Sequence, residues 1–460
     1  MTHHGHGAHR RHGHAIVIGA GIAGLLAARA LSETFQQVDI LERDRLPSTC
    51  KPRPGVPQGR HAHALQARGL QLFEEFFPGL QDELSKAGAP LVDFCAHARL
   101  QLPGGAPPPA TSGIFIQPVS RPFLEKAVRD RVARIPGVRI RDQIAVMGLL
   151  QDPADRRVTG VRLKHRSPQH RPDEYLRADL VIDASGRGSH LPDWLAALGL
   201  PRPAETIVDA NVAYVTRHFA ADPDHPGDWL ALFETPRAPD FPRGCFALRT
   251  EGNQLIVTLQ GAAGDHPPKD EQGFQTFLES LAHATVNTIA QMVPLSAPYR
   301  YAHTANRRRH LKSVRPWPDG LIALGDAACV FNPVYAQGMT VAALQTLALR
   351  DLLECHELHG IASAFQRRSA HITRWPWLMA TLSDLGWTAD ASTSLLLRAA
   401  QWYLGRWYAL IPHHPDMFQD FARVVNMLCG PGVLARPRHL WRIIGPGPMT
   451  KSLGAVRPIM

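Results

Sequence analysis

Short apolar runs and longer Ala- and Leu-rich segments alternate along the chain. Uninterrupted runs of the kind found in buried strands occur at 15–18 (AIVI), 180–182 (LVI) and 320–325 (GLIALG). The first run leads into GLLAARAL and the last is soon followed by GMTVAALQTLAL, and the composition of both segments predicts helices. Strands that alternate with helices predict a Rossmann-like α/β fold.

Two later regions have a different pattern. Between about 200 and 300, segments such as ANVAYVTRHF and QLIVTLQG are rich in β-branched residues and are separated by loops with Pro, Gly and Asp. They predict an antiparallel sheet that forms the substrate pocket, and segment 82–104 is expected to join it. From about 375 the chain is rich in Leu, Trp and Arg, which predicts amphipathic helices. We expect a helical cap over the substrate cleft, with a face for a partner or a membrane surface as the alternative.

The composition is that of a globular chain with a large core. Of its 460 residues, 45% are hydrophobic, and no window has the ~18 uninterrupted apolar residues of a membrane-spanning helix. The N-terminal stretch MTHHGHGAHRRHGHA lacks the apolar region of a secretory signal, and we expect a disordered His-rich tail at 1–14. The six cysteines are scattered, which predicts no metal site and a reducing, cytoplasmic setting.

The formal charge of +10 is carried mostly by arginine. These arginines are spread along the chain, and RRRH at 307–310 is the only dense basic run, which argues against a nucleic-acid-binding protein. A basic surface or a site for an anionic cofactor is the better interpretation.

A glycine pattern after the first strand predicts a dinucleotide site. Gly19, Gly21 and Gly24 have the spacing G-x-G-x-x-G, which allows a tight turn, close approach of a pyrophosphate and close packing of helix on strand. About 20 residues further on, the strand QVDILER ends with Glu42, where an acid would bind ribose hydroxyls and favour FAD or NAD over NADP. The expected contacts also include Ala20, Ala23 and Arg43.

A lone acid stands at the end of a second strand. Asp326 follows the run 320–325, and a predicted helix begins soon afterwards at Gly338. Because a helix N-terminus stabilises an anion by about 0.3–1 kcal/mol, the arrangement suits a ligand with hydroxyls on one side and an electron-rich ring edge on the other. A plain helix cap or turn acid is the alternative.

With these two motifs at 19–24 and 325–327, the chain resembles the FAD-dependent class A monooxygenases, the group of p-hydroxybenzoate hydroxylase. The resemblance covers about residues 14–385 and implies a GR2-type FAD-binding domain. It places Asp326 on the ribityl chain and Pro333 beside the flavin, where oxygen reacts. The backbone N–H groups that would face the flavin ring belong to Gly338, Met339 and Thr340.

Three more residues match positions of this family. Arg121, in the predicted helix SRPFLEKAVRDRV, matches an arginine that reaches the FAD phosphates or ribose, and Val146 matches a residue whose backbone contacts adenine. Asp183, in LVIDASGRG, matches an acid linked to FAD and NADPH. Ala184 stands where the family has glycine, so the chain departs from the nicotinamide motif at this point.

The stretch VPQGRHAHAL is similar to the flavin epoxidases of polyether antibiotic pathways and related bacterial oxidoreductases. The residues that this similarity implies at the flavin edge are Gln58, Arg60, His61 and His63, and His61 or His63 is a candidate catalytic base. The family chemistry transfers one oxygen atom from O2 through a C4a-hydroperoxyflavin.

An alkene epoxidase of natural-product biosynthesis with an apolar substrate is the expected function, because few acids or histidines fall on the predicted sheet strands. The alternatives are a phenol hydroxylase and a flavin-dependent reductase or dehydrogenase. NAD(P)H is the implied electron donor, and a separate flavin reductase is a further candidate partner.

The expected organisation has four parts. They are the tail at 1–14, a discontinuous FAD-binding domain at 15–81, 105–199 and 301–374, a substrate-binding sheet domain at 82–104 and 200–300, and a helical cap at 375–460.

Overall fold

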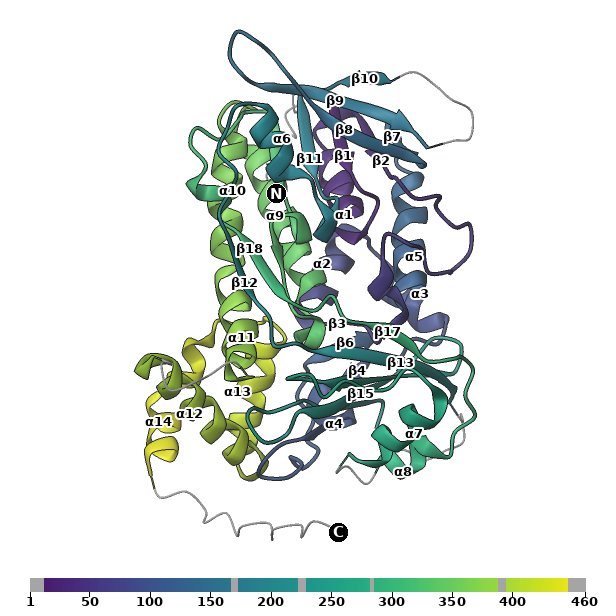
Figure 1. The fold of residues 1–460 in the computed structure, drawn as a ribbon, viewed down its shortest axis with the longest axis vertical. Helices are drawn as coiled ribbons and strands as arrows, with labels where there is room; N and C mark the ends of the chain where they lie inside the picture. The colour runs from purple at the N-terminus through teal and green to yellow at the C-terminus, as the bar shows by residue number, and fades with distance from the viewer. Residues whose placement is uncertain (1–11, 167–172, 222–228, 282–284, 388–393, 446–460) are drawn as a thin grey trace, which may run out of the picture.

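The computed structural model describes residues 12–166, 173–221, 229–281, 285–387 and 394–445. In the view of Figure 1, a parallel sheet and its helices form the upper half, a second sheet lies below them, and the C-terminal helices lie beside the second sheet. No helix in these ranges is long and apolar enough to cross a bilayer.

Five parallel strands form the first sheet, in the order β19-β11-β1-β2-β7. Their bounds are β1 His12–Ile18, β2 Phe35–Leu41, β7 Val138–Arg141, β11 Leu180–Asp183 and β19 Leu321–Ala323. Every residue of β11 and β19 is buried, as the uninterrupted apolar runs predicted. The three strands β1, β11 and β19 lie side by side although they are far apart in the sequence.

Helices and a small antiparallel sheet pack against this parallel sheet. The helix α1 (Ile22–Leu31) contacts α5 (Arg121–Ala133) and α9 (Gly338–Cys355), and α9 in turn contacts α2 (Ala67–Phe76) and α10 (Ile361–Ile372). The antiparallel strands β8 (Ile144–Gln151), β9 (Val158–His165) and β10 (Glu174–Arg177) form a sheet that contacts β11 and β2. The predicted Rossmann-like α/β arrangement is therefore confirmed.

The second sheet has six strands in the order β17-β13-β16-β15-β14-β5. Their bounds are β5 Ala98–Gln101, β13 Ala213–Ala220, β14 Ala231–Glu234, β15 Arg243–Thr250, β16 Gln254–Gly261 and β17 Tyr299–Tyr301. Residues such as Val215 and Val257 face the helices α7 (Glu271–Glu279) and α8 (Thr285–Ala290) in one core. Their neighbours Thr216 and Thr258 point to the other face because side chains alternate along a strand.

The C-terminal part is helical, as predicted. Its helices are α11 Arg374–Asp384, α12 Leu395–Leu410, α13 Pro415–Val425 and α14 Pro437–Ile444. Trp407 and Phe418 from these helices share a core with Phe94 and with Leu100 of β5, so the helices pack at the β5 end of the second sheet.

Three details differ from the expected boundaries. Within 82–104, β5 alone joins the second sheet, because the segment before it forms helices and a short strand that pairs elsewhere. The strand β12 (Glu205–Val208) pairs with β18 (Asn306–Arg309) and not with the second sheet. The strand β1 begins at His12, so 12–14 belong to it, while 1–11 of the expected tail lie outside the described residues.

The remaining helices and strands connect these layers. They are β3 Ala64–Leu65, α3 Leu80–Lys86, β4 Val92–Asp93, α4 Phe94–His97, β6 Phe115–Pro118, α6 Leu191–Ala197 and β20 Cys329–Val330.

Candidate functional site

The glycine turn between β1 and α1 is packed so tightly that larger residues would not fit. Gly19 has a φ of +101° and lies against Ala184, whose carbonyl oxygen would be 2.6 Å from a Cβ at Gly19. A Cβ at Gly24 would lie 1.9 Å from the Gly19 carbonyl oxygen. Gly21 is the N-cap of α1. The three glycines thus bring the helix N-terminus to the carboxyl end of the sheet, where a phosphate can approach it.

Glu42, directly after β2, stands beside this turn. Its carboxylate accepts hydrogen bonds from the backbone N–H of Ala20 at 2.9 Å and of Asp44 at 3.0 Å. The same carboxylate lies 3.1 Å from Arg53 Nη1. These contacts fix the acid at the strand end where the sequence predicts the ribose contact.

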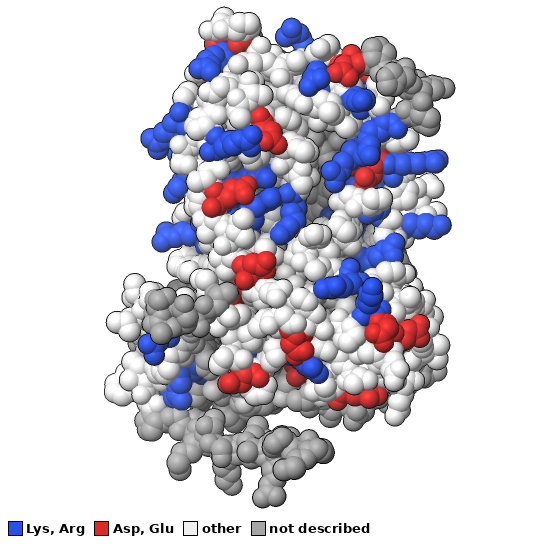
Figure 2. Space-filling model, viewed as in Figure 1, with Lys and Arg blue, Asp and Glu red and all other residues white. Residues whose placement is uncertain are grey.

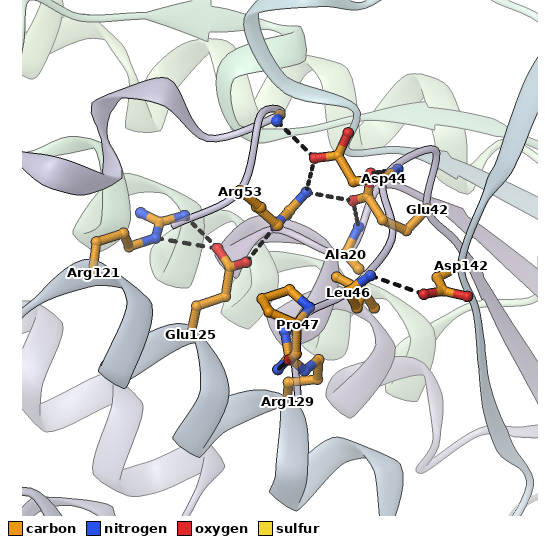
Figure 3. Close-up of polar contacts among 11 residues, drawn as sticks. Ala20, Glu42, Asp44, Leu46, Pro47, Arg53, Arg121, Glu125, Arg129 and Asp142 are labelled. Carbon is orange, nitrogen blue, oxygen red and sulfur yellow. Dashed lines mark hydrogen bonds and ion pairs between the residues drawn. The ribbon is translucent and has the colours of Figure 1, made fainter. Parts of the chain in front are cut away.

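Arg53, which the sequence did not single out, is the centre of a buried ionic cluster (Figure 3). It contacts Glu42, Asp44 at 3.0 Å and Glu125 at 2.7 Å, and Glu125 also lies 3.3 Å from Arg121. Burial lowers the pKa of Arg53, but the carboxylates of Glu125 and Glu42 raise it more, and the net shift is upward.

Arg53 lies where its positive charge can help to bind a dinucleotide. Its Nη2 would be 3.9 Å from a Cβ at Gly21, so a positive charge stands over the turn that a pyrophosphate would approach. Arg121, at the start of α5, also lines the cavity beside this turn. No local sequence pattern marks Arg53, because its acidic partners come from the end of β2 and from α5.

Asp326 lies in the short 3-10 helix Gly325–Ala327 at the end of β19 and lines the same cavity. No hydrogen bond or ion pair to its carboxylate is formed within the described part of the chain. Burial raises the pKa of Asp326, while the positive charges of Arg121, Arg187 and Arg307 act in the opposite direction. Arg187 and Arg307 also line the cavity and were not predicted.

The loop between Asp326 and α9 supplies the next wall. Pro333, Gly338 and Met339 line the cavity, and their placement near the flavin stays a prediction. Gln337 was not predicted, yet it also lines the cavity, and neither its Oε1 nor its Nε2 has a partner in the described part of the chain. A buried amide without partners at the N-terminus of α9 is a ready contact for the polar edge of a ring.

His61 and His63 follow the 3-10 helix Pro57–Arg60, and both line the cavity together with Gln58. His61 Nδ1 lies 2.6 Å from Thr216 Oγ1, which is 2.7 Å from Thr258 Oγ1. Burial lowers the pKa of His61 to about 3, and burial lowers the pKa of His63 to about 4, helped by the charge of Arg121. Both imidazoles are therefore neutral at physiological pH.

Two expected side-chain contacts, of Arg60 and Asp183, are turned away from the cavity. The Arg60 guanidinium lies 4.4 Å from the ring centroid of Tyr299, in a cation–π contact at the surface. The Asp183 carboxylate accepts hydrogen bonds from Ser185 and Ser189 and so holds the turn after β11. The contact expected of Thr340 is made by its backbone N–H at the start of α9 and stays a prediction, while its hydroxyl faces Gly69.

The other expected residues lie in the turn or the cavity wall. Val146 and Arg43 line the cavity, and Ala23 both lines it and packs against Gly325, where a Cβ would be 2.8 Å from that of Ala23. Ala20 lies in the glycine turn and donates its N–H to Glu42.

The cavity itself has a volume of ≈ 1280 Å³, large enough for a dinucleotide and a substrate. Figure 2 shows Lys and Arg side chains on both sides of the furrow in the upper half of this face. The arginines in the cavity wall are Arg43, Arg53, Arg121, Arg162, Arg166, Arg187 and Arg307. The acids in the same wall are Glu42, Asp193 and Asp326.

These features fit FAD. The positive wall suits the pyrophosphate, Glu42 suits the ribose, and the unpartnered Asp326 and Gln337 suit the ribityl chain and the ring. Among the described residues, no group of three His, Cys, Asp or Glu side chains could hold a metal ion.

Comparisons with known proteins agree with this geometry. The family model described as "FAD binding domain" matches residues 13–380. The chain is 34% identical over 390 residues to protein Rv3254 of Mycobacterium tuberculosis, covering 81% of this chain and 80% of that protein. It is 25% identical over 467 residues to a kynurenine 3-monooxygenase of Salinispora arenicola, covering 89% of this chain and 90% of that protein.

Two more distant likenesses complete the comparison. The chain is 22% identical over 354 residues to squalene epoxidase 4 of Arabidopsis thaliana, covering 74% of this chain and 61% of that protein. The solved structure of the flavin-dependent brominase Bmp2 superposes with a TM-score of 0.66 at 14% identity, covering 90% of this chain and 94% of that chain. The structural likeness shows the shared fold.

Proposed function

The chain belongs to the FAD binding domain family and is an FAD-dependent monooxygenase, and on this premise we propose that it epoxidises an electron-rich, largely apolar alkene. Bound and reduced, FAD supplies the activation of O2 from which one oxygen atom reaches the substrate. The chain's own residues bind the cofactor, orient the substrate and exclude water from the reacting atoms.

The proposal rests on one observation: the aromatic rings nearest to His61 in the cavity wall are uncharged. Its cavity neighbours are Tyr301, with a ring centroid 5.4 Å from that of His61, and Tyr214, at 6.3 Å. The described wall contains three acids. We assign Glu42 and Asp326 to the binding of FAD, and Asp193 forms an ion pair with Arg202 at 2.6 Å.

Such a wall suits a substrate that does not have to lose a proton. A phenol reacts best after deprotonation, and a base works well when its pKa lies near the operating pH. The pKa of His61 is lowered to about 3, far below that of a phenol at about 10, so His61 is a poor base for this step. An alkene needs no base, and its double bond can lie against neutral side chains.

Aromatic hydroxylation is the second candidate. The kynurenine 3-monooxygenase relative favours it by its name, whereas the squalene epoxidase relative favours the alkene. For either reaction we propose NAD(P)H as the electron donor, with a separate flavin reductase as the alternative source of electrons.

The two candidates are separated by product analysis with oxygen-18. The FAD-loaded protein is incubated with NAD(P)H, 18O2 and either a long-chain polyene or a set of phenols, with catalase present to remove peroxide. We expect one 18O atom in an epoxide of the polyene. Stoichiometric 18O incorporation into a phenol, with NAD(P)H consumption but no oxygenated polyene, would reject epoxidation and leave the monooxygenase assignment in place.

A further inference from the structure

A buried chain of hydrogen bonds fixes the imidazole of His61 on the six-stranded sheet. The backbone N–H of Ala62 donates to Thr258 Oγ1 at 3.1 Å. Thr258 Oγ1 lies 2.7 Å from Thr216 Oγ1, which in turn lies 2.6 Å from His61 Nδ1. The imidazole and both threonine side chains are buried, so water competes little for these bonds.

The chain of bonds joins two parts of the fold. His61 comes from the loop after β2, whereas Thr216 lies on β13 and Thr258 lies directly opposite it on β16. The rings nearest to the imidazole are those of Tyr214 on β13 and Tyr301 on β17. His61 therefore belongs to the part of the cavity wall that the six-stranded sheet forms.

The positions of the protons follow from a count of donors and acceptors. Three donors are present: the Ala62 N–H and the hydroxyls of Thr258 and Thr216. Each finds an acceptor only if all the bonds run toward the imidazole, so that the Thr216 hydroxyl donates to His61 Nδ1. In the opposite direction the Thr258 proton would be buried without an acceptor in the described part of the chain, which is unfavourable.

The single proton of the imidazole is then on its other nitrogen. Burial lowers the pKa of His61 to about 3, so the ring is neutral at physiological pH and has one N–H group. Because Nδ1 accepts from Thr216, this N–H group is at Nε2. Nε2 has no hydrogen-bond partner among the described residues and is not enclosed by protein, so it is open to the cavity that His61 lines.

We propose that His61 is a specificity-determining residue whose Nε2–H donates a hydrogen bond to a neutral oxygen acceptor of the substrate, and that Thr216 is the positioning residue that holds this tautomer. The substrate class that fits is an alkene that also bears a carbonyl oxygen. The identity of the bound molecule rests on the oxygen-transfer function proposed above, whereas the tautomer does not depend on it.

A fixed N–H donor beside uncharged rings selects among ligands. A carbonyl oxygen pairs with it, whereas a hydrocarbon that displaces water from this place leaves the N–H unpaired. A phenol cannot pass its proton to Nε2, because that nitrogen already holds one. The tautomer that recognises a carbonyl group thus also prevents His61 from acting as a base.

Two matched probes test the donor. They are geranylacetone, an unsaturated methyl ketone, and the hydrocarbon in which CH2 replaces its carbonyl group. Each is titrated into the oxidised, FAD-loaded full chain, and the change in flavin absorbance gives its Kd. In His61→Phe, which keeps an aromatic ring but has no donor, we expect the ratio of the ketone Kd to the hydrocarbon Kd to rise about fivefold, equivalent to about 1 kcal/mol for one hydrogen bond.

Thr216 provides a matched pair of variants at a position behind His61. Its side chain is fully buried and lies outside the residues that line the cavity. Thr216→Val removes the hydroxyl, so Nδ1 can hold the proton, and the ratio of the two Kd values should rise as in His61→Phe. Thr216→Ser keeps the hydroxyl and should behave like the wild type. A purely structural effect of Thr216→Val would weaken the binding of both probes alike and leave the ratio unchanged.

Nuclear magnetic resonance examines the tautomer without a probe. In FAD-loaded protein with 15N-labelled histidine, long-range 1H–15N correlations show which ring nitrogen carries the proton, and the His61 signals are those lost in His61→Phe. We expect the proton on Nε2 in the wild type and in Thr216→Ser, and on both nitrogens in exchange in Thr216→Val.

Two results would overturn the proposal. One is a protonated Nδ1 of His61 in the wild type. The other is an unchanged ratio of Kd values in His61→Phe, which would mean that the substrate does not accept the bond. A failure of the epoxidase proposal is distinguishable from both, because it would change the oxygen-18 products and leave the tautomer and the ratios as expected.

Discussion

Glu42 and Asp326, the two carboxylates that we propose contact FAD, have opposite hydrogen-bond environments. Glu42 is held by two backbone N–H groups and by Arg53, so its position is set before any ligand arrives. Asp326 has no such partner in the described part of the chain. We infer that Asp326 gains its hydrogen bonds from the ribityl hydroxyls, and that its substitution affects binding more than folding.

Replacement of Asp326 by alanine should therefore weaken FAD binding. A hydrogen bond to a charged group contributes about 1.5–3 kcal/mol, which corresponds to an increase in Kd of about 10- to 150-fold. Flavin fluorescence during titration of the apoprotein measures this change. Asp193→Ala, at an exposed acid of the same cavity, serves as the control and should bind FAD like the wild type. Equal Kd values for Asp326→Ala and the wild type would refute the ribityl contact.

At the residue scale, local motifs could be predicted and long-range partners could not. The glycine turn and Glu42 lie where the spacing placed them, because a turn and a strand end are set by neighbouring residues. Arg53 and Gln337 were missed because their surroundings are assembled from distant segments. Arg60 was expected at the flavin edge, yet the ring of Tyr299 attracts its guanidinium to the surface.

At the scale of single elements, the contact between the glycine turn and α1 is too close for a side chain larger than that of glycine. Gly24→Ala would bring a methyl group within 1.9 Å of the Gly19 carbonyl oxygen. We expect a loss of stability of about 1–3 kcal/mol, typical of overpacking, together with poorer FAD retention. Thermal unfolding and the FAD content of the purified variant measure both effects.

A glycine in another helix provides the matched control. Gly405 lies inside α12, and no atom is within 4 Å of a Cβ placed there. Gly405→Ala should raise the unfolding temperature, because alanine in a helix interior is favoured over glycine by about 0.5–1 kcal/mol. If both variants were equally stable, close packing at Gly24 would not be the reason for a glycine there.

Element prediction succeeded where the pattern was strong. The apolar runs at 15–18, 180–182 and 320–325 correspond to β1, β11 and β19. It failed for the partners of weaker segments: β12 pairs with β18, which a one-dimensional pattern does not reveal. The reason is that strand pairing depends on topology, whereas periodicity reports only which face is buried.

At the scale of the whole molecule, His61 and His63 of the cavity wall make stability depend on pH. The pKa of His61 is lowered from 6.5 to about 3, so the unfolded chain binds a proton more readily than the folded chain. The contribution of His61 to the free energy of unfolding has its full value above pH 6.5, the pKa of histidine in the unfolded chain. It decreases as the pH falls below that value. At pH 5 the loss amounts to about 2 kcal/mol for His61, and His63 adds to it.

The double variant His61→Gln with His63→Gln should accordingly resist acid better than the wild type. Urea unfolding at pH 7 and pH 5 measures the free energy of unfolding, and the decrease between the two values should be smaller in the variant. Asp384 acts in the opposite direction in both proteins, because its raised pKa favours the folded state below about 6. The same decrease in both proteins would mean that the histidines are already charged in the folded state.

The order of strands in the parallel sheet has a consequence for the synthesis of the protein. The neighbours β1, β11 and β19 come from the beginning, the middle and the last third of the chain. A ribosome must therefore complete the chain beyond β19 and the start of α9 before the FAD cavity can close. A nascent chain that stalls before residue 320 carries the glycine fingerprint and Glu42 but neither Asp326 nor the helix N-terminus at Gly338. We therefore expect FAD to bind only after β19 and the start of α9 have been synthesised, and we expect shorter translation products to lack it.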